Sequence, residues 1–195
     1  MKIGIMGGTF DPIHIGHLMA AEYAAEHAGI DEGWFVPTHA PPHKAHSPSA
    51  SAADRLKMVE LAIQGNSRFQ VLDWEIRSGG ISYSIETAKM LKKRYPDYDF
   101  AWMIGADMVQ YLPKWHEIEK LSALIRFIGF ARPGTAIDLS SLEEPMRSSV
   151  QLVSIPLMDI SSTRIRERIR QGLSVRYMVP EEVLNYLKVR QIYES

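Results

Sequence analysis

Two histidines stand a few residues behind a pair of glycines near the start of the chain, in the segment Gly7-Gly8-Thr9-Phe10-Asp11-Pro12-Ile13-His14-Ile15-Gly16-His17. Glycines directly after a short apolar run let the backbone approach a ligand closely. His14 and His17 are three positions apart at the expected start of a helix, so both can lie on one face of it. Imidazole nitrogens donate hydrogen bonds to phosphate oxygens, and the N–H groups of a helix start favour an anion at the same place. The segment therefore predicts a phosphate-binding turn.

This turn matches neither of two common nucleotide-binding fingerprints. It contains no G-x-G-x-x-G of the dinucleotide folds and no G-x-x-x-x-G-K-[ST] of the P-loop NTPases. The structural alternative is a tight glycine turn whose histidines only cap the helix or pack against it.

A second cluster of phosphate-binding residue types lies near the C-terminus, in Ile160-Ser161-Ser162-Thr163-Arg164-Ile165-Arg166. Three hydroxyl residues precede an expected helix, and each can cap free N–H groups or bind a phosphate there. The guanidinium group of Arg166 suits a phosphate because its fork donates two hydrogen bonds at once. The alternative is an ordinary helix cap on a solvated basic helix. Together with the first cluster, phosphate binding is favoured over this alternative.

Short apolar runs alternate along the chain with segments of helical period. Strands are expected at 2–6, 34–36, 69–72, 100–104, 125–131 and 151–155, and helices at 17–28, 52–63, 84–95, 162–171 and 180–189. This alternation predicts an α/β fold, a parallel sheet flanked by helices, with a small helical part from about residue 160 to 195. We expect one domain over residues 1–195. Ligands of such sheets bind at the carboxyl ends of the strands, where several of the candidate residues lie.

The composition restricts the class of protein. The 195 residues include 22 Lys+Arg against 23 Asp+Glu, a balance that argues against a dedicated nucleic-acid binder. The absence of cysteine excludes a disulfide scaffold and a thiolate metal site. The start does not have the pattern of a signal peptide, and no apolar stretch approaches the roughly 20 residues of a membrane span, so we expect a cytoplasmic protein. No repeat or heptad in the sequence marks a subunit interface, so the sequence does not decide between a monomer and a homo-oligomer.

The tetrad His14-Ile15-Gly16-His17 resembles the H-x-G-H signature of the nucleotidylyltransferase superfamily, and residues 160–166 resemble the I-S-S-T-x-x-R motif of its adenylyltransferases. The resemblance implies a Rossmann-like nucleotidylyltransferase fold with His14, His17 and Arg166 as catalytic residues around the phosphates of ATP. The positions that it implies for binding ATP are Gly7, Gly8, Thr9, Phe10, Gly105, Asp107, Ile160, Ser161, Ser162 and Thr163.

Further segments resemble the bacterial nicotinate mononucleotide adenylyltransferases, namely Pro41-Pro42-His43-Lys44, Ser82-Tyr83-Ser84, Ile104-Gly105-Ala106-Asp107 and Arg132-Pro133-Gly134. The positions that this resemblance implies for the mononucleotide are Lys44, Tyr83, Ser84, Asp107, Trp115, His116 and Arg132. Trp115 would stack on the pyridine ring and Asp107 would bind sugar hydroxyls. His116 stands where the family often has tyrosine, and Ser84 where it has threonine. The structural alternatives are a solvated lysine, a plain helix cap and a packed tryptophan.

The resemblance implies transfer of AMP from ATP to nicotinate mononucleotide, which gives deamido-NAD and pyrophosphate in NAD biosynthesis. Mg²⁺ is expected to arrive with ATP, because no compact carboxylate cluster predicts a metal held by the protein. Nicotinamide mononucleotide and phosphopantetheine are alternative acceptors within the superfamily. A non-catalytic nucleotide-sensing module is the alternative from another class, since a fold alone does not establish chemistry. The expected partners are ATP and nicotinate mononucleotide, with no nucleic-acid polymer and no membrane.

Overall fold

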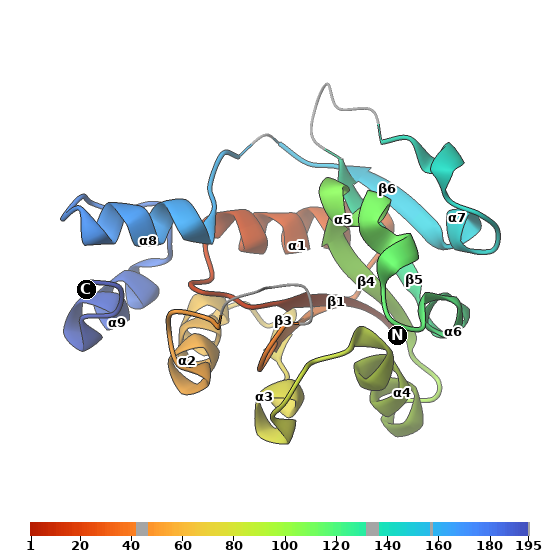
Figure 1. Ribbon diagram of the computed structural model, residues 1–195, viewed down its shortest axis with the longest axis horizontal. Coiled ribbons are helices and arrows are strands. Elements are labelled where there is room, and N and C mark those ends of the chain that lie inside the picture. The colour runs from red at the N-terminus through yellow and green to blue at the C-terminus, as the bar shows by residue number, and fades with distance from the viewer. Residues whose placement is uncertain (42–46, 132–136, 157, 195) are drawn as a thin grey trace. The chain divides into compact units, whose positions relative to one another are not determined.

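The computed structural model describes residues 1–41, 47–131, 137–156 and 158–194 (Figure 1). In this part of the chain six strands form one sheet with the order β3-β2-β1-β4-β5-β6. The strands are β1 (Lys2–Gly8), β2 (Glu32–Pro37), β3 (Phe69–Val71), β4 (Asp99–Gly105), β5 (Arg126–Ala131) and β6 (Val150–Ser154). The pairs β1–β4, β4–β5 and β5–β6 are parallel. The strand order reverses between β1 and β4, which is the position where open parallel sheets bind their ligands.

Helices lie between successive strands, as the alternating pattern predicts, and α8 and α9 follow the last strand. The described ones are α1 (Ile15–Ala28), α2 (Ala52–Ile63), α3 (Trp74–Ser78), α4 (Ser84–Arg94), α5 (Ala106–Tyr111), α6 (Ile118–Leu124), α7 (Met146–Ser149), α8 (Ser162–Arg170) and α9 (Glu181–Arg190), with 3₁₀ turns η1 (Leu112–Lys114) and η2 (Leu139–Ser141). Every expected strand and helix is observed within two residues of its expected ends. The sequence did not indicate α3, α5, α6, α7 or the 3₁₀ turns, because segments of three to seven residues are too short to display a helical period.

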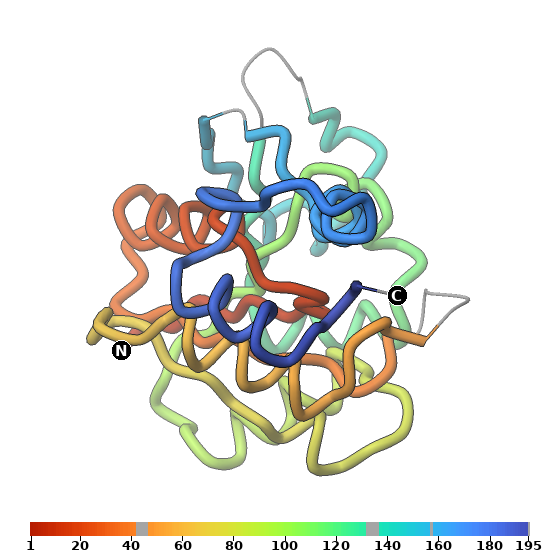
Figure 2. Tube along the Cα trace, turned by 90° about the vertical axis from the view of Figure 1, so that its left-hand side faces the viewer, coloured from red at the N-terminus to blue at the C-terminus, as the bar shows by residue number. Residues whose placement is uncertain are grey.

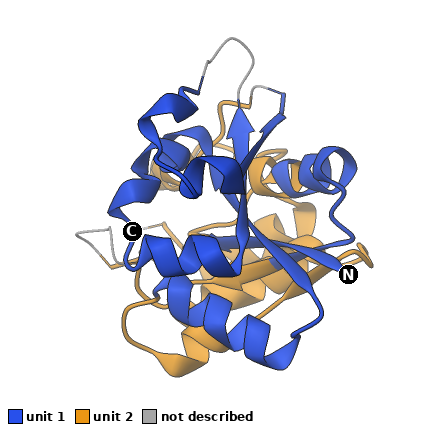
Figure 3. Cartoon of the chain, turned by 90° about the vertical axis from the view of Figure 1, so that its right-hand side faces the viewer, with its two compact units in different colours: residues 1–7, 20–34, 83–157 blue, residues 8–19, 35–82, 158–195 orange. Residues whose placement is uncertain are grey.

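The chain divides into two compact units, each assembled from three separated stretches of sequence (Figure 3). Unit 1 comprises residues 1–7, 20–34 and 83–157, and unit 2 comprises residues 8–19, 35–82 and 158–195. Neither unit is a continuous piece of the sequence.

Buried side chains of the strands β4 and β5 form much of the core of unit 1. Trp102 of β4 is in register with Phe127 of β5, and both side chains are buried. The indole of Trp102 lies where a side chain of Gly7 would be, since a Cβ atom at Gly7 would stand 2.8 Å from it. Packing against Trp102 therefore favours glycine at this end of β1.

Unit 2 contains the expected C-terminal helical part as two separate helices, α8 and α9, which are blue in Figure 2. The helix α9 packs on α2, where the Tyr186 hydroxyl donates to the Asp54 carboxylate at 2.8 Å. Ser51 caps α2 by accepting a hydrogen bond from the Asp54 N–H at 3.1 Å. No helix in the described part of the chain is both long and apolar enough to cross a bilayer.

Candidate active site

The glycine turn of unit 2 is held in one conformation by Phe10. This residue has φ of 48°, in the left-handed region that side chains rarely adopt, and is 2% exposed. Its ring packs edge-on against His17, with ring centroids 5.1 Å apart, and a Cβ atom at Gly8 would stand 3.2 Å from it. Strained backbone of this kind persists only when surrounding contacts fix it, and it concentrates at functional sites.

The two histidines of the predicted turn lie against one another at the start of α1. Their rings stack with centroids 3.7 Å apart. The main-chain N–H of His14 donates to Nδ1 of His17 at 3.2 Å. Because Nδ1 of His17 accepts this bond, the proton of a neutral His17 ring lies on Nε2. Nε2 of His17 is thus the nitrogen that can donate to a phosphate oxygen.

His14 is buried, with 7% of its surface exposed. Burial lowers its pKa from 6.5 to about 4, so the ring is neutral at pH 7. Its Nδ1 atom has no hydrogen-bond partner among the described residues, and a side chain of Gly16 would stand 3.1 Å from that atom. A buried polar atom without a partner costs free energy, which a ligand can recover by pairing with it.

The start of α8 is bonded to the loop that leads to His14. Nη1 of Arg166 donates to the main-chain oxygen of Asp11 at 2.7 Å, and the Ser162 hydroxyl donates to that of Pro12 at 2.8 Å. These partners are separated by 150 residues or more of sequence. The structure therefore brings the two predicted phosphate-binding clusters together in unit 2.

The hydroxyl residues at the start of α8 have partners within the protein. Ser161 caps the helix by accepting from the Arg164 N–H at 3.2 Å, and Thr163 accepts from Nη2 of Arg166 at 3.3 Å. The hydroxyl proton of Ser162 is engaged with the loop. A phosphate here would meet mainly the N–H groups of the first helical turn and Arg166, whose buried Nε has no partner among the described residues. Ile160, before the cap, is half-buried.

Arg55 is a site residue that the sequence reasoning missed. It is 1% exposed, and its guanidinium donates to the main-chain oxygens of Thr9 and Thr38 at 2.7 Å each and of His39 at 3.1 Å. The cation ties the glycine turn to the segment after β2. A signal was present in the sequence, since Arg55 lies at helical spacing with the apolar Met58.

Asp11 and Tyr193 were also missed. The Asp11 carboxylate, 5% exposed, accepts the main-chain N–H groups of Ser49 and Ala50 at 2.8 and 2.9 Å. It also accepts the hydroxyl of Tyr193 at 2.6 Å. Asp11 stands within the first motif, but nothing in the sequence pairs it with Tyr193, 182 positions away.

The predicted residues of unit 1 follow β4 and precede α4. Gly105 is the N-cap of α5, and Asp107 is exposed in its first turn. Tyr83 is the N-cap of α4, without a side-chain cap, and its ring lies 4.5 Å from that of His116. Ser84 is the first residue of α4.

Trp115 is half-buried in unit 1 and packs edge-on against two aromatic rings. The ring centroids of Trp102 and Phe127 lie 6.5 and 6.2 Å away. Its Nε1 atom is buried and has no partner among the described residues. Trp115 therefore contributes to the core of unit 1, which is the alternative interpretation of a packed tryptophan. Lys44 and Arg132 lie outside the described residues.

Comparisons with known proteins agree with the geometry. The sequence pattern of the cytidylyltransferase-like family matches residues 5–168. The chain is similar to the probable nicotinate-nucleotide adenylyltransferase of Bacillus pumilus, with 45% identity over 194 residues that cover 100% of this chain and 99% of that protein. It is also similar to the nicotinate-nucleotide adenylyltransferase of Bacillus subtilis, with 41% identity and the same coverage.

A solved structure has the same fold. The nicotinic acid mononucleotide adenylyltransferase of Plasmodium falciparum, complexed with NaAD, superposes with a TM-score of 0.82 at 24% identity. The match covers 99% of this chain and 97% of that one. The Rossmann-like nucleotidylyltransferase fold expected from the sequence is confirmed by this likeness and by the strand order.

Proposed function

The chain belongs to the cytidylyltransferase-like family, and we propose that it transfers AMP from ATP to nicotinate mononucleotide, releasing pyrophosphate and forming deamido-NAD. The observation that carries this proposal is the joining of the two phosphate-binding motifs. Arg166 and Ser162 of α8 bond the loop that leads directly into the His14–His17 pair. Full-length similarity to the named Bacillus proteins supports the choice of acceptor.

The reaction needs no general base from the protein. An oxygen of the 5′-phosphate of nicotinate mononucleotide is already an anion, and it attacks the α-phosphorus of ATP. The bond between that phosphorus and the bridging oxygen to the β-phosphate breaks, and pyrophosphate leaves with the electron pair. Catalysis then consists of positioning the two phosphates in line and stabilising the charge that builds up on the transferred group.

His17 is suited to stabilise the transferred α-phosphoryl group, since its Nε2 carries the proton of the neutral ring. The positive charge comes from Arg166, whose partnerless Nε adds to the helix N-terminus in attracting the β- and γ-phosphates. Neutral His14 contributes hydrogen-bonding capacity and holds His17 through its main-chain N–H. His14 and His17 therefore do not act as two cations, because burial keeps His14 uncharged.

Mg²⁺ enters this proposal as part of the substrate Mg·ATP. Among the described residues no group of three or more His, Asp or Glu stands close enough to hold a metal ion. Magnesium keeps several waters and binds readily to substrate phosphates, so phosphate oxygens and water would supply its ligands.

The acceptor residues that we propose belong to unit 1. Trp115 would stack on the pyridine ring, beside Tyr83 and His116, and Asp107 would accept hydrogen bonds from sugar hydroxyls. The N–H groups at the start of α4, including that of Ser84, are donors suited to the nicotinate carboxylate. Lys44 and Arg132 keep their predicted role as positions that bind the mononucleotide.

One experiment separates this function from its alternatives. Pyrophosphate release from Mg·ATP is measured with nicotinate mononucleotide, nicotinamide mononucleotide and phosphopantetheine in parallel, and the product is identified by mass. We expect deamido-NAD to form fastest. Preference for either other acceptor would reassign the substrate, and ATP binding without release in all three reactions would favour the nucleotide sensor.

The cellular setting remains part of the proposal. We place the reaction in the cytoplasm, where ATP is abundant, and we expect no nucleic-acid polymer among its partners, in keeping with a net charge of −1. Light scattering on the purified protein would distinguish a monomer from a homo-oligomer.

A further inference from the structure

Asp11 connects its own segment of unit 2 to three others. Its carboxylate accepts two main-chain N–H groups at residues 49 and 50 and the hydroxyl of Tyr193. Its main-chain oxygen accepts Nη1 of Arg166 at 2.7 Å, and the same nitrogen lies 3.8 Å from the carboxylate. Asp11 is therefore in direct contact with the guanidinium of Arg166 through both its main chain and its side chain.

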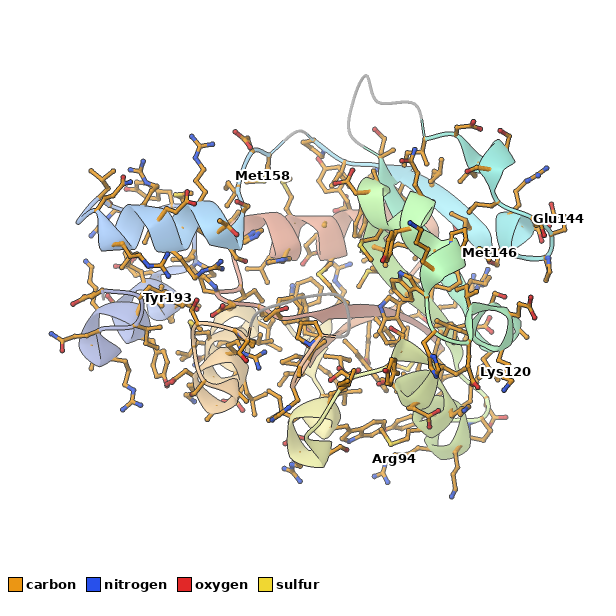
Figure 4. The ribbon with its side chains drawn as sticks, in the orientation of Figure 1. Arg94, Lys120, Glu144, Met146, Met158 and Tyr193 are labelled. Carbon is orange, nitrogen blue, oxygen red and sulfur yellow. The ribbon has the colours of Figure 1, made fainter. Side chains whose placement is uncertain are left out.

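Tyr193, labelled in Figure 4, is the most distant of these partners in the sequence. It is 6% exposed and has φ of 71°, a left-handed conformation that a tyrosine keeps only when its contacts hold it. Burial, followed by the Asp11 carboxylate, raises the pKa of its hydroxyl well above the ordinary value, so the hydroxyl stays protonated and donates. A neutral donor satisfies the carboxylate without bringing another anion near Arg166.

We propose that Tyr193 is a positioning residue: through Asp11 it sets the place of Arg166 for the triphosphate of ATP. This inference rests on the proposed function, in which Arg166 binds those phosphates. With its hydroxyl on Asp11, Tyr193 completes the hydrogen bonds of a carboxylate that also faces Arg166. Tyr193 donates to Oδ1 of Asp11, whereas Nη1 of Arg166 lies 3.8 Å from Oδ2. Without the bond from Tyr193 the negative charge of the carboxylate is less compensated, and the carboxylate competes more strongly with the triphosphate for the guanidinium of Arg166.

The test is a double-mutant cycle on Mg·ATP binding, measured by calorimetry on the full chain. Tyr193→Phe removes one oxygen atom, and Tyr186→Phe is its matched control, since that hydroxyl donates to Asp54. We expect Tyr193→Phe to weaken Mg·ATP binding about tenfold, as the loss of a hydrogen bond to a charged group does, and Tyr186→Phe to change it less than about twofold. In an Arg166→Ala background the effect of Tyr193→Phe should fall below about twofold.

Two results would overturn the proposal. An equal loss of binding from Tyr193→Phe with and without Arg166 would mean that Tyr193 acts independently of it. An equal loss from both tyrosine variants would mean general loosening of the C-terminal segment. Because ATP binding needs no acceptor, this measurement stands even if pyrophosphate release shows that the proposed acceptor is wrong.

A second measurement decides the matter without any change at Tyr193. In protein labelled with ¹³C at tyrosine Cζ, the signal of Tyr193 is identified by its absence from the spectrum of Tyr193→Phe. We expect this signal to shift when Mg·ATP is added to the unmodified chain and to stay in place in Arg166→Ala. A signal that does not respond in the unmodified chain would refute the link between Tyr193 and the triphosphate site.

Discussion

The main-chain N–H of His14 donates to Nδ1 of His17 at 3.2 Å, while the two rings stack with centroids 3.7 Å apart. One histidine thus fixes both the ring orientation and the tautomer of the other. The spacing of the H-x-G-H tetrad has a physical reason in this geometry. Gly16 stands between the two because a side chain there would press on the ring of His14.

Replacement of His17 by alanine should lower kcat by about 10² to 10³, the cost of losing one preorganised donor to a transition state. The fold should change little, because His17 is only half-buried. Turnover and circular dichroism on the same sample check both expectations. His27→Ala is the control, since that exposed histidine lies in the last turn of the same helix. Near-normal turnover of the His17 variant would remove it from catalysis.

The buried ring of His14 makes stability depend on pH. Folding lowers its pKa from 6.5 to about 4, so between these values the unfolded chain binds a proton that the folded chain does not. The free energy of unfolding therefore keeps this contribution above about pH 6.5 and loses it as the pH falls toward 4. A shift of this size corresponds to about 3 kcal/mol.

Urea unfolding of the unmodified chain and of His14→Gln at pH 7.5 and pH 4.5 tests this expectation. Going from the higher to the lower pH, the unmodified chain should lose about 2 to 3 kcal/mol more than the variant, because glutamine does not titrate. His116→Gln, at an exposed position, is the control for the loss of a histidine elsewhere in the chain. If both chains lose the same free energy, His14 is not the responsible group.

The elements of this fold were predictable because their signals are local. The helix 52–63 was expected at both of its ends, since its apolar spacing and the cap at Ser51 lie within one stretch of sequence. The short helices were not, and neither was the contact of Tyr193 with Asp11, because no local rule pairs residues 182 positions apart. The two phosphate motifs were identified from their residue types, but their joining through Arg166 and Asp11 needed the structure.

Gly7 and Gly105 were both predicted as nucleotide contacts, and the structure separates them. A Cβ atom at Gly7 would stand 2.8 Å from the indole of Trp102, whereas one at Gly105 would have nothing within 4 Å. Gly7→Ala should therefore cost about 1 to 3 kcal/mol of stability, and Gly105→Ala less than about 0.5 kcal/mol. Thermal unfolding measures both. If Gly105 approaches ATP, its alanine variant should bind Mg·ATP more weakly while remaining as stable as the parent.

Trp115→Ala should weaken binding of nicotinate mononucleotide and leave Mg·ATP binding intact, since base–aromatic stacking contributes about 1 to 3 kcal/mol. Some loss of stability is also expected, because the ring packs on Trp102 and Phe127. Trp115→Phe retains a stacking face and should recover most of the binding. Trp74→Phe is the tryptophan control. A titration in which ATP binding falls and mononucleotide binding persists would exclude Trp115 from the pyridine site.

Arg55 is expected to affect both the stability of the fold and the geometry of the turn at Thr9. Its guanidinium donates to three main-chain oxygens, those of Thr9, Thr38 and His39, from a position 1% exposed. A lysine ammonium is a point charge that cannot reproduce this fork, so Arg55→Lys leaves buried carbonyl groups unpaired. The free energy of unfolding should fall by about 2 to 4 kcal/mol.

Urea unfolding measures this loss, with Arg170→Lys as the control at an exposed position of α8, where the change should stay within about 0.5 kcal/mol. Because Thr9 belongs to the glycine turn, the lysine variant should also bind Mg·ATP more weakly under conditions in which it is fully folded. A variant with normal stability would show that lysine reaches these carbonyls after all. A variant that is destabilised but binds ATP normally would limit Arg55 to holding the fold.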